Sequence, residues 1–182
     1  MKKLAQLVCC SLLTHLSVSA NEASIDFGSD VVNIDFVSEN VIQDTSIGFG
    51  GLFADDDISL VNVSMMVKGD LGDDSNWNVG LGGNLYLAKV DDEYVQGFGL
   101  GTEIAYQFSR FPKLSAKTSL YYVPSVAISD DLDHMVDFTA KLSYQLLNRA
   151  DVFIGYRNVE LDADHGSIEL DEGFHAGMTF TF

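Results

Sequence analysis

Hydrophobic and polar residues alternate with a period of two along most of the chain, a pattern typical of β-strands with two different faces. The clearest alternation lies in 94–108, 114–128 and 135–147. In each, one face is continuously apolar and the other carries glycine, hydroxyl, amide and charged side chains. Two further segments, 58–69 and 77–90, alternate in the same way, and 45–53 and 152–161 do so less regularly. The pattern predicts an antiparallel all-β protein.

Alternation alone does not separate a membrane β-barrel from a soluble β-sandwich, but three further features favour the barrel. Several predicted strands are about 12 to 15 residues long, longer than usual soluble strands and suited to a tilted membrane crossing. Proline is confined to Pro112 in a turn and Pro124 late in a strand. Aromatic residues lie near segment ends, as in an interfacial girdle: Trp77, Tyr94, Phe108, Tyr122, Tyr144 and Phe182. We therefore expect the apolar faces to contact lipid.

Strand number follows from the connections between the alternating segments. Residues 45–182 account for eight strands, and residues 24–37 can add a hairpin around Gly28-Ser29-Asp30. We expect a closed antiparallel transmembrane β-barrel of 8–10 strands, with ten preferred. Because such barrels have both ends in the periplasm, we place 109–113 and 148–151 on the periplasmic side. The external connections are then 55–57, 91–93, 129–134 and 162–172.

Residues 1–20 have the pattern of a secretory signal peptide. Lys2 and Lys3 form a basic start, residues 4–16 are mostly apolar, and Val18-Ser19-Ala20 is a small-residue cleavage site. A lipoprotein is disfavoured because Leu7-Val8 before Cys9 lacks the small residue of a lipidation box. We expect cleavage near Ala20, which removes both cysteines and leaves residues 21–182 as an outer-membrane barrel domain without disulfides.

The formal net charge of −17, from 10 Lys+Arg and 27 Asp+Glu, argues against binding of nucleic acid. The acidic residues concentrate in short runs that we interpret as solvated loops. Carboxylates there can share Ca²⁺ or Mg²⁺ with lipopolysaccharide phosphates, as hard cations allow. Residues 162–167 are reminiscent of a calcium loop but lack a third oxygen ligand and the terminal glutamate. We therefore predict neither a protein metal site nor a cofactor.

The C-terminal residues carry the most specific pattern of the sequence. Phe174, Ala176, Met178, Phe180 and the terminal Phe182 occupy alternate positions. This resembles the C-terminal signature of bacterial outer-membrane proteins, in which a terminal aromatic residue is recognised by the barrel-assembly machinery. The resemblance implies that machinery as a partner, with Phe174, Met178, Phe180 and Phe182 as the assembly signal.

With both ends considered, the mature chain resembles the YfaZ family of small Gram-negative outer-membrane β-barrel proteins. The residues that carry the resemblance are Val32-Asn33-Ile34-Asp35-Phe36, Ile47-Gly48-Phe49-Gly50-Gly51 before Asp55-Asp56-Asp57, Gly155-Tyr156-Arg157-Asn158 and Gly177-Met178-Thr179-Phe180-Thr181-Phe182. The resemblance implies the fold and the outer-membrane location. It supplies no catalytic signature.

The polar faces supply the candidate functional residues. A barrel of eight to ten strands has a narrow interior, so we expect a packed polar core with little open pore. The predicted inward ionisable residues are Glu103, Lys117, Asp137, Lys141, Arg157 and His175. The simpler hypothesis is that they pair with one another. The sharper hypothesis is a narrow ion or solute path lined by their charges.

An enzyme that modifies outer-membrane lipid is the competing hypothesis. Small barrels that hydrolyse or acylate lipid A resemble one another in using Ser and His near the outer rim, where this chain offers His134 or His165 with Ser129 or Ser167. No fixed spacing links these residues as a nucleophile and its base, so we predict no catalytic residue. We expect a monomer in contact with outer-membrane lipid and lipopolysaccharide, with a structural, adhesive or porin-like channel role.

Overall fold

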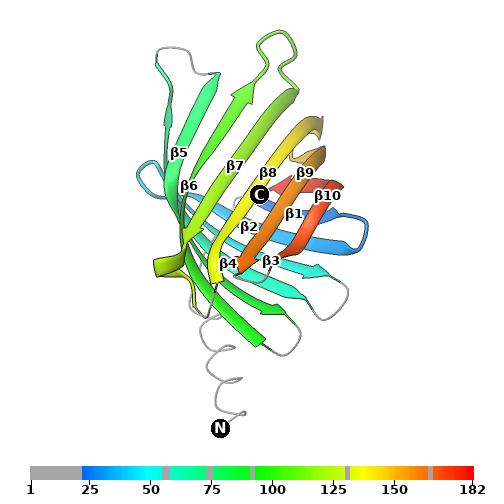
Figure 1. Cartoon of the computed structure of the whole chain (residues 1–182). Helices are drawn as coiled ribbons and strands as arrows, with labels where there is room; N and C mark the ends of the chain where they lie inside the picture. Colours follow the sequence, from blue (N-terminus) through cyan, green and yellow to red (C-terminus); the bar gives the residue numbers. More distant parts are fainter. Residues whose placement is uncertain (1–21, 55–57, 73–75, 91–92, 130–131, 164–165) are drawn as a thin grey trace, which may run out of the picture.

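A closed antiparallel barrel of ten strands is the architecture of the chain in the computed structural model (Figure 1). The structure describes residues 22–54, 58–72, 76–90, 93–129, 132–163 and 166–182. The strands are β1 (Glu22–Phe27), β2 (Val31–Ile42), β3 (Thr45–Ala54), β4 (Ser59–Asp70), β5 (Trp77–Val90), β6 (Glu93–Gln107), β7 (Leu114–Pro124), β8 (Leu132–Leu147), β9 (Ala150–Ala163) and β10 (Gly166–Thr181). The predicted fold class is confirmed, and the hairpin around residues 28–30 does complete a ten-strand barrel.

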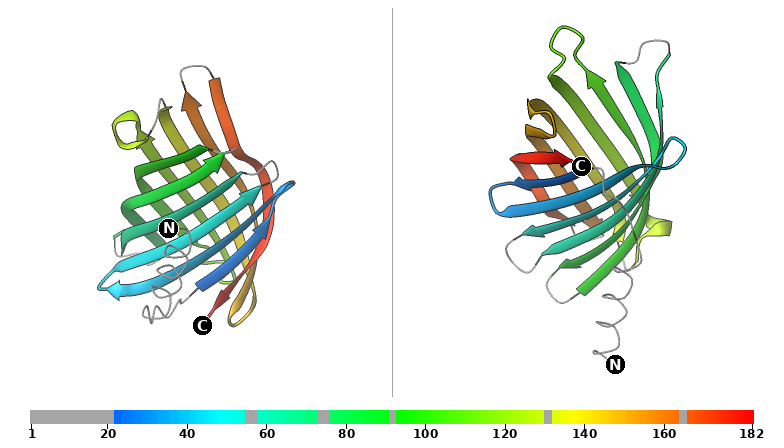
Figure 2. Two further views of the ribbon diagram at one scale, coloured as in Figure 1. Left: turned by 90° about the horizontal axis from the view of Figure 1, so that it is seen from below. Right: turned by 180° about the vertical axis from the view of Figure 1, so that it is seen from behind.

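Each strand pairs with its neighbours in sequence, and β1 pairs with β10 to close the ring. Figure 2 shows the strands tilted steeply around the ring, with β1 to β4 forming the wall opposite β7 and β8. Closure satisfies the backbone groups of every strand edge, which a hydrocarbon environment requires. Among the described residues, no helix is long and apolar enough to cross a bilayer.

The outer face of the barrel is apolar over most of its strands, as the alternation predicted. Large side chains stand exposed there, and Phe174 at 82% is an extreme case. An exposed apolar surface that encircles the molecule is expected to be covered by lipid. On β9 and β10 the apolar surface ends at Asn158 and Glu172, which pair across the two strands one row beyond Tyr156 and Phe174.

The two rims of the barrel, an open end and a closed end, carry different segments. The open end carries the turns 43–44 and 148–149, together with the start of β1 and the end of β10. The closed end carries the turn 28–30 and the short 3₁₀ helix η1 (Ser125–Ala127). At the open end Asp44 adopts a left-handed backbone (φ 58°) in the tight turn between β2 and β3, a conformation that Asp tolerates better than most residues.

The interior departs from the predicted polar core at the closed end. One cluster of buried residues fills it, here called the apolar plug: Val31, Leu52, Leu60, Met66, Tyr86, Ala88, Tyr121, Val123, Met135, Val159, Leu161 and Leu170. All strands from β2 to β10 contribute, β6 through the partly buried Val95. The period of two correctly separated inside from outside, but it did not show that inward positions near the closed end are apolar.

The segment after β7 also differs from the prediction. The strand predicted over 114–128 ends at Pro124, and η1 follows. Ile128, predicted on the outer face, packs against the apolar plug and bridges to Gly97 on β6. The amide of Ser129 donates a hydrogen bond to the Gln96 carbonyl at 2.8 Å. The chain therefore folds over the closed end because pairing with β6 and contact with the plug stabilise that path.

The acidic run 162–172, predicted to be a solvated loop, is mostly strand. The prediction was wrong because β9 continues to Ala163 and β10 begins at Gly166. The register between β9 and β10 shifts between Glu169 and Asp171, which makes Leu170 the extra residue of a bulge. Leu170 joins the plug, while Asp171 bonds the interior Arg157. The predicted signal peptide and its cleavage near Ala20 lie outside the described residues, as do 55–57 and 91–92.

Shortening Leu161 to alanine should destabilise the folded barrel, because this plug side chain is only 1% exposed and its truncation leaves a cavity. The free energy of unfolding, measured in lipid vesicles by urea titration, is expected to fall by about 3 kcal/mol. The matched control is Leu147→Ala at the open end, 65% exposed, where a loss below about 1 kcal/mol is expected. Equal losses in the two variants would contradict a packed plug.

Candidate functional site

A polar cavity of about 880 Å³ lies inside the barrel between the open end and the apolar plug. At the open end it is lined by Glu22, Asp44, Asp70 and Asp151, which stand at strand ends or in a turn. Deeper in, the lining consists mainly of amide, hydroxyl and charged side chains. The cavity ends on plug residues Leu52, Leu60, Tyr121 and Val159. The interior is therefore less completely filled than the sequence predicted.

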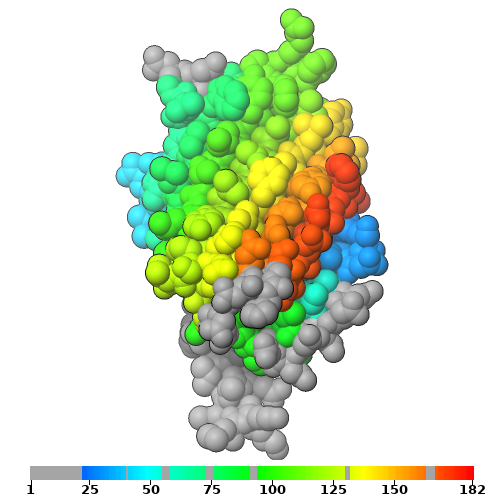
Figure 3. Space-filling view, in the orientation of Figure 1, coloured from blue at the N-terminus to red at the C-terminus, as the bar shows by residue number. Residues whose placement is uncertain are grey.

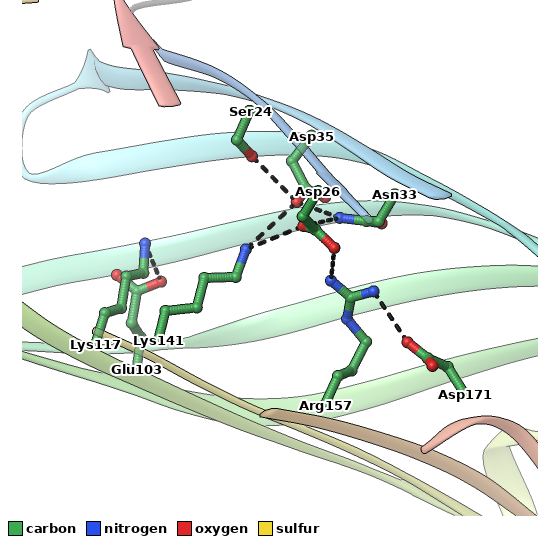
Figure 4. A network of polar contacts seen from close by, with 9 residues as sticks. All are labelled: Ser24, Asp26, Asn33, Asp35, Glu103, Lys117, Lys141, Arg157 and Asp171. Atoms are coloured by element: carbon green, nitrogen blue, oxygen red, sulfur yellow. Dashed lines mark hydrogen bonds and ion pairs between the residues drawn. The ribbon is translucent and has the colours of Figure 1, made fainter. Parts of the chain in front are cut away.

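A buried charge cluster ties β1 to β9 and β10 (Figure 4). Asp26 on β1 is fully buried, and its Oδ1 lies 2.6 Å from Nη2 of Arg157 on β9. The other guanidinium nitrogen, Nη1, donates to Oδ2 of Asp171 at 3.0 Å. Asn33 on β2 donates to Oδ2 of Asp26 at 3.2 Å. Because Arg157 faces two carboxylates, its buried charge is compensated by hydrogen-bonded partners, as burial of an ion requires.

Lys141 extends this cluster into the cavity. Its Nζ lies 3.7 Å from Oδ2 of Asp26 and 3.9 Å from Oδ2 of Asp35. The same ammonium lies 4.7 Å from the centroid of the Phe153 ring, within range of a cation–π contact. Asp35 also accepts a hydrogen bond of 2.7 Å from Asn33, so the cluster spans β1, β2, β8, β9 and β10.

A second charge cluster is centred on Glu103 of β6. One carboxylate oxygen lies 3.0 Å from Nζ of Lys68, and the other lies 2.9 Å from Nζ of Lys117. Lys68 also contacts Glu39 of β2 at 2.8 Å. The two lysines therefore share three ion pairs with two glutamates, and their charges are largely neutralised within the protein.

Asp137 stands between the charged zone and the plug. Its Oδ2 accepts a hydrogen bond of 2.7 Å from the hydroxyl of Tyr86, a plug residue. Tyr86 packs edge-on against Tyr121, with ring centroids 6.4 Å apart. Gly101 permits this packing, because a side chain at that position would collide with the Tyr121 ring.

His175 occupies a different position from the other predicted residues. It is 4% exposed, and among the residues that the structure describes neither ring nitrogen has a hydrogen-bond partner. Its ring packs against Phe153 with centroids 6.0 Å apart and lies over Gly155, where any side chain would collide with it. It is an inward residue buried in the wall, separate from the cavity lining formed by Glu103, Lys117, Asp137, Lys141 and Arg157.

Several residues of the two clusters were missed as candidates: Asp26, Asp35, Glu39, Lys68 and Asp171. Lys68 has the same strand parity as Asn62 and Ser64 on the polar face of 58–69, so the alternation carried a signal for it. In the first hairpin Asp26 alternates with Ile25 and Phe27, and Asp35 alternates with Ile34 and Phe36. The same period of two therefore carried a signal that both carboxylates face inward. For Asp171 no signal existed, because its inward direction depends on the bulge at Leu170.

The predicted assembly signal lies on the outer surface of β10 and at the chain end. Phe174, Met178, Phe180 and Phe182 are all exposed there. Their role in recognition by the assembly machinery stays a prediction.

Among the residues considered for catalysis, those that the structure describes do not form a nucleophile and base. Nε2 of His134 lies 2.8 Å from Asp162 on β9, and Asp162 in turn pairs with Ser167 on β10. Strand β9 therefore separates the serine from the histidine by about 10 Å, two strand spacings, whereas a serine nucleophile needs its base within hydrogen-bond reach. Ser129 instead accepts a hydrogen bond from the Gln96 amide. His165 lies outside the described residues.

A metal site is also not found in the part of the chain that the structure describes. No group of three or more His, Cys, Asp or Glu residues there could hold a metal ion.

Comparison with known proteins gives a family and a set of distant folds. The family model described as YfaZ precursor matches residues 1–182. No curated protein matches the chain significantly. Among solved structures, a KdgM porin is 13% identical with a TM-score of 0.47, covering 88% of this chain and 98% of its own. The outer membrane channel DcaP of Acinetobacter baumannii is 12% identical with a TM-score of 0.44, covering 91% of this chain and 55% of its own.

Removing the guanidinium of Arg157 should strongly destabilise the barrel, because Asp26 and Asp171 then lose their main compensating charge. We expect Arg157→Met to lower the free energy of unfolding in lipid vesicles by about 3 kcal/mol or more. The double variant Asp26→Asn with Arg157→Met should recover part of that loss. The control Lys117→Met, whose side chain is 40% exposed, should cost less than about 1 kcal/mol. Additive losses in the double variant would contradict coupling between Asp26 and Arg157.

Proposed function

The chain belongs to the YfaZ family, and we propose that it is a narrow outer-membrane channel with a charged lumen and an apolar gate. The fold and the family point to the outer membrane. In this proposal the 880 Å³ cavity is the vestibule and the apolar plug is the gate. A leader cleaved near Ala20 would export the chain, and the even strand number would place the open end in the periplasm.

The polar cavity that ends on a cluster of apolar side chains is the observation that supports a channel best. A barrel with a purely structural role is most stable when its interior is filled, because cavities forfeit packing contacts. Here the plug fills one end and leaves the other as a hydrated volume lined by charges. Apolar constrictions gate channels by dewetting, since water and ions enter them only when they widen.

The charge distribution along the cavity favours cations. Lys68, Lys117, Lys141 and Arg157 each contact at least one carboxylate. At the open end the lining carboxylates are Glu22, Asp44, Asp70 and Asp151, and within the described residues no ion pair involves any of the four. A mouth lined by one sign of charge concentrates the opposite ion. We therefore expect cations to enter more readily than anions.

Conductance in planar bilayers tests the gate. The wild-type barrel should give rare and small openings, because the plug separates the cavity from the closed end. Met135→Ser, which places a small polar group in the plug, should increase the time-averaged conductance at least about threefold by favouring water in the constriction. Met65→Ser, on the outer face of β4 and 57% exposed, is the matched control. Silent bilayers for the wild type and Met135→Ser alike would favour a structural or adhesive role.

Ion selectivity tests the acidic mouth separately. The reversal potential under a salt gradient should show a preference for cations in the wild type. Asp70→Asn combined with Asp151→Asn should shift that potential toward zero, because both carboxylates line the cavity near its opening. Asp30→Asn at the closed-end turn should leave it unchanged. An unchanged reversal potential in the double variant would contradict selection at the mouth.

A further inference from the structure

The outer wall of the barrel contains a hollow of about 490 Å³ that has no part in the lumen. It lies over β7 and β8 on the face presented in Figure 3, between β5–β6 on one side and β9–β10 on the other. Its lining is almost entirely apolar and includes Trp77, Tyr106, Ala116, Ala140, Tyr156 and Phe174, together with Lys117 and Lys141.

Strand register explains why the wall is hollow there. Ala116 and Thr118 on β7 pair with Leu142 and Ala140 on β8, so three small side chains lie side by side. On one side Tyr106 pairs with Ala116 and with Trp77 of β5. On the other side Ala140 pairs with Tyr156, which pairs with Phe174. A floor of small residues therefore lies between two walls of aromatic residues.

Ring contacts hold each wall in place. The centroids of Trp77 and Tyr106 lie 4.4 Å apart, and those of Tyr156 and Phe174 lie 5.6 Å apart, both within the range of favourable aromatic pairs. Strands β6 and β9, which carry Tyr106 and Tyr156, stand three strand spacings apart, about 14 Å. The hollow is thus formed before any partner arrives.

The chemistry of the lining restricts the occupant to hydrocarbon. The ammonium groups of Lys117 and Lys141 are engaged inside the barrel, with Glu103 at 2.9 Å and with Asp26 at 3.7 Å. The backbone of β7 pairs with β6 and β8, and that of β8 pairs with β7 and β9, so a peptide cannot add a further strand here. The hollow is continuous with the apolar face that contacts lipid, and the lipid is therefore the medium that meets it.

A second copy of the chain is a poorer occupant. Two copies related by a twofold axis through this face would place hollow against hollow, because the same patch is used on both sides. Such a contact would leave the small-residue floor uncovered and forfeit the packing that filling it provides. A flexible acyl chain can enter between the aromatic walls and contact the floor directly.

One end of the hollow also reaches the polar border of the outer face. The hydroxyl of Tyr156 donates a hydrogen bond of 2.9 Å to Glu172, and Asn158 lies beside Glu172 in the next row. A lipid whose chain occupies the hollow can therefore keep its headgroup near polar side chains. We propose that this hollow is a binding site for one acyl chain of an outer-membrane lipid, held longer than the surrounding lipid.

The single tryptophan of the chain, Trp77, reports on this site. The barrel is reconstituted in phosphatidylethanolamine vesicles with brominated acyl chains, then transferred to detergent and washed. The wild type should retain a lipid in native mass spectrometry and keep Trp77 fluorescence quenched. Ala116→Leu combined with Ala140→Leu fills the floor and should lower the retained lipid about tenfold, equivalent to about 1.4 kcal/mol.

Ala176→Leu is the matched control, because Ala176 lies on the outer face in the same row as Ile154 but does not line the hollow. It should retain lipid as the wild type does, with an unchanged urea unfolding curve. A wild type that keeps no lipid, or a floor variant that keeps as much as the control, would overturn the proposal. A dimer mass that disappears in the floor variant would instead assign the hollow to contact between copies.

Discussion

Pairing of β1 with β10 is the interaction on which the rest of the structure depends. β1 has only six residues, and it joins β10 and β2 through six residue pairs on each side. In hydrocarbon an open strand edge would leave backbone groups without partners. The seam is reinforced from inside by Asp26, whose carboxylate bonds Arg157 of β9 and Asn33 of β2. The shortest strand therefore carries the fully buried carboxylate that connects the first strands to the last.

The interior is divided because charges and apolar side chains satisfy different requirements. The charge clusters around Arg157 and Glu103 lie beside the cavity, where each charge has a protein partner of opposite sign. The plug lies beyond them, where no ionisable group is needed and packing alone stabilises the fold. Tyr86 spans the boundary, since its ring belongs to the plug and its hydroxyl bonds Asp137.

The sequence was sufficient to predict the barrel fold and the inward direction of several charged residues of the site. Period-two alternation placed Glu103, Lys117 and Lys141 on the inward face because strand geometry alone decides that direction. The alternation did not identify the ion-pair partner of each charge. A salt bridge such as that between Asp26 and Arg157 joins residues that are distant in the chain, and it depends on closure of the barrel. The alternation also gives no height of a residue along the barrel axis. That height decides whether an inward residue such as Leu161 contacts the cavity or the plug. The hollow over Ala116 and Ala140 depends on the register of six strands, and no local pattern specifies it.

The bulge at Leu170 connects the two zones of the interior in a way that regular pairing could not. In a regular strand, adjacent residues point to opposite faces, so Leu170 and Asp171 could not both point inward. The extra residue allows Leu170 to pack in the plug while Asp171 bonds Arg157. Arg157 in turn bonds Asp26 at the seam. Leu170 is joined by a peptide bond to Asp171. A displacement of Leu170 in the plug would therefore also move the carboxylate that bonds Arg157. In the proposed channel this linkage would couple a widening of the closed end to Arg157, which lines the polar cavity.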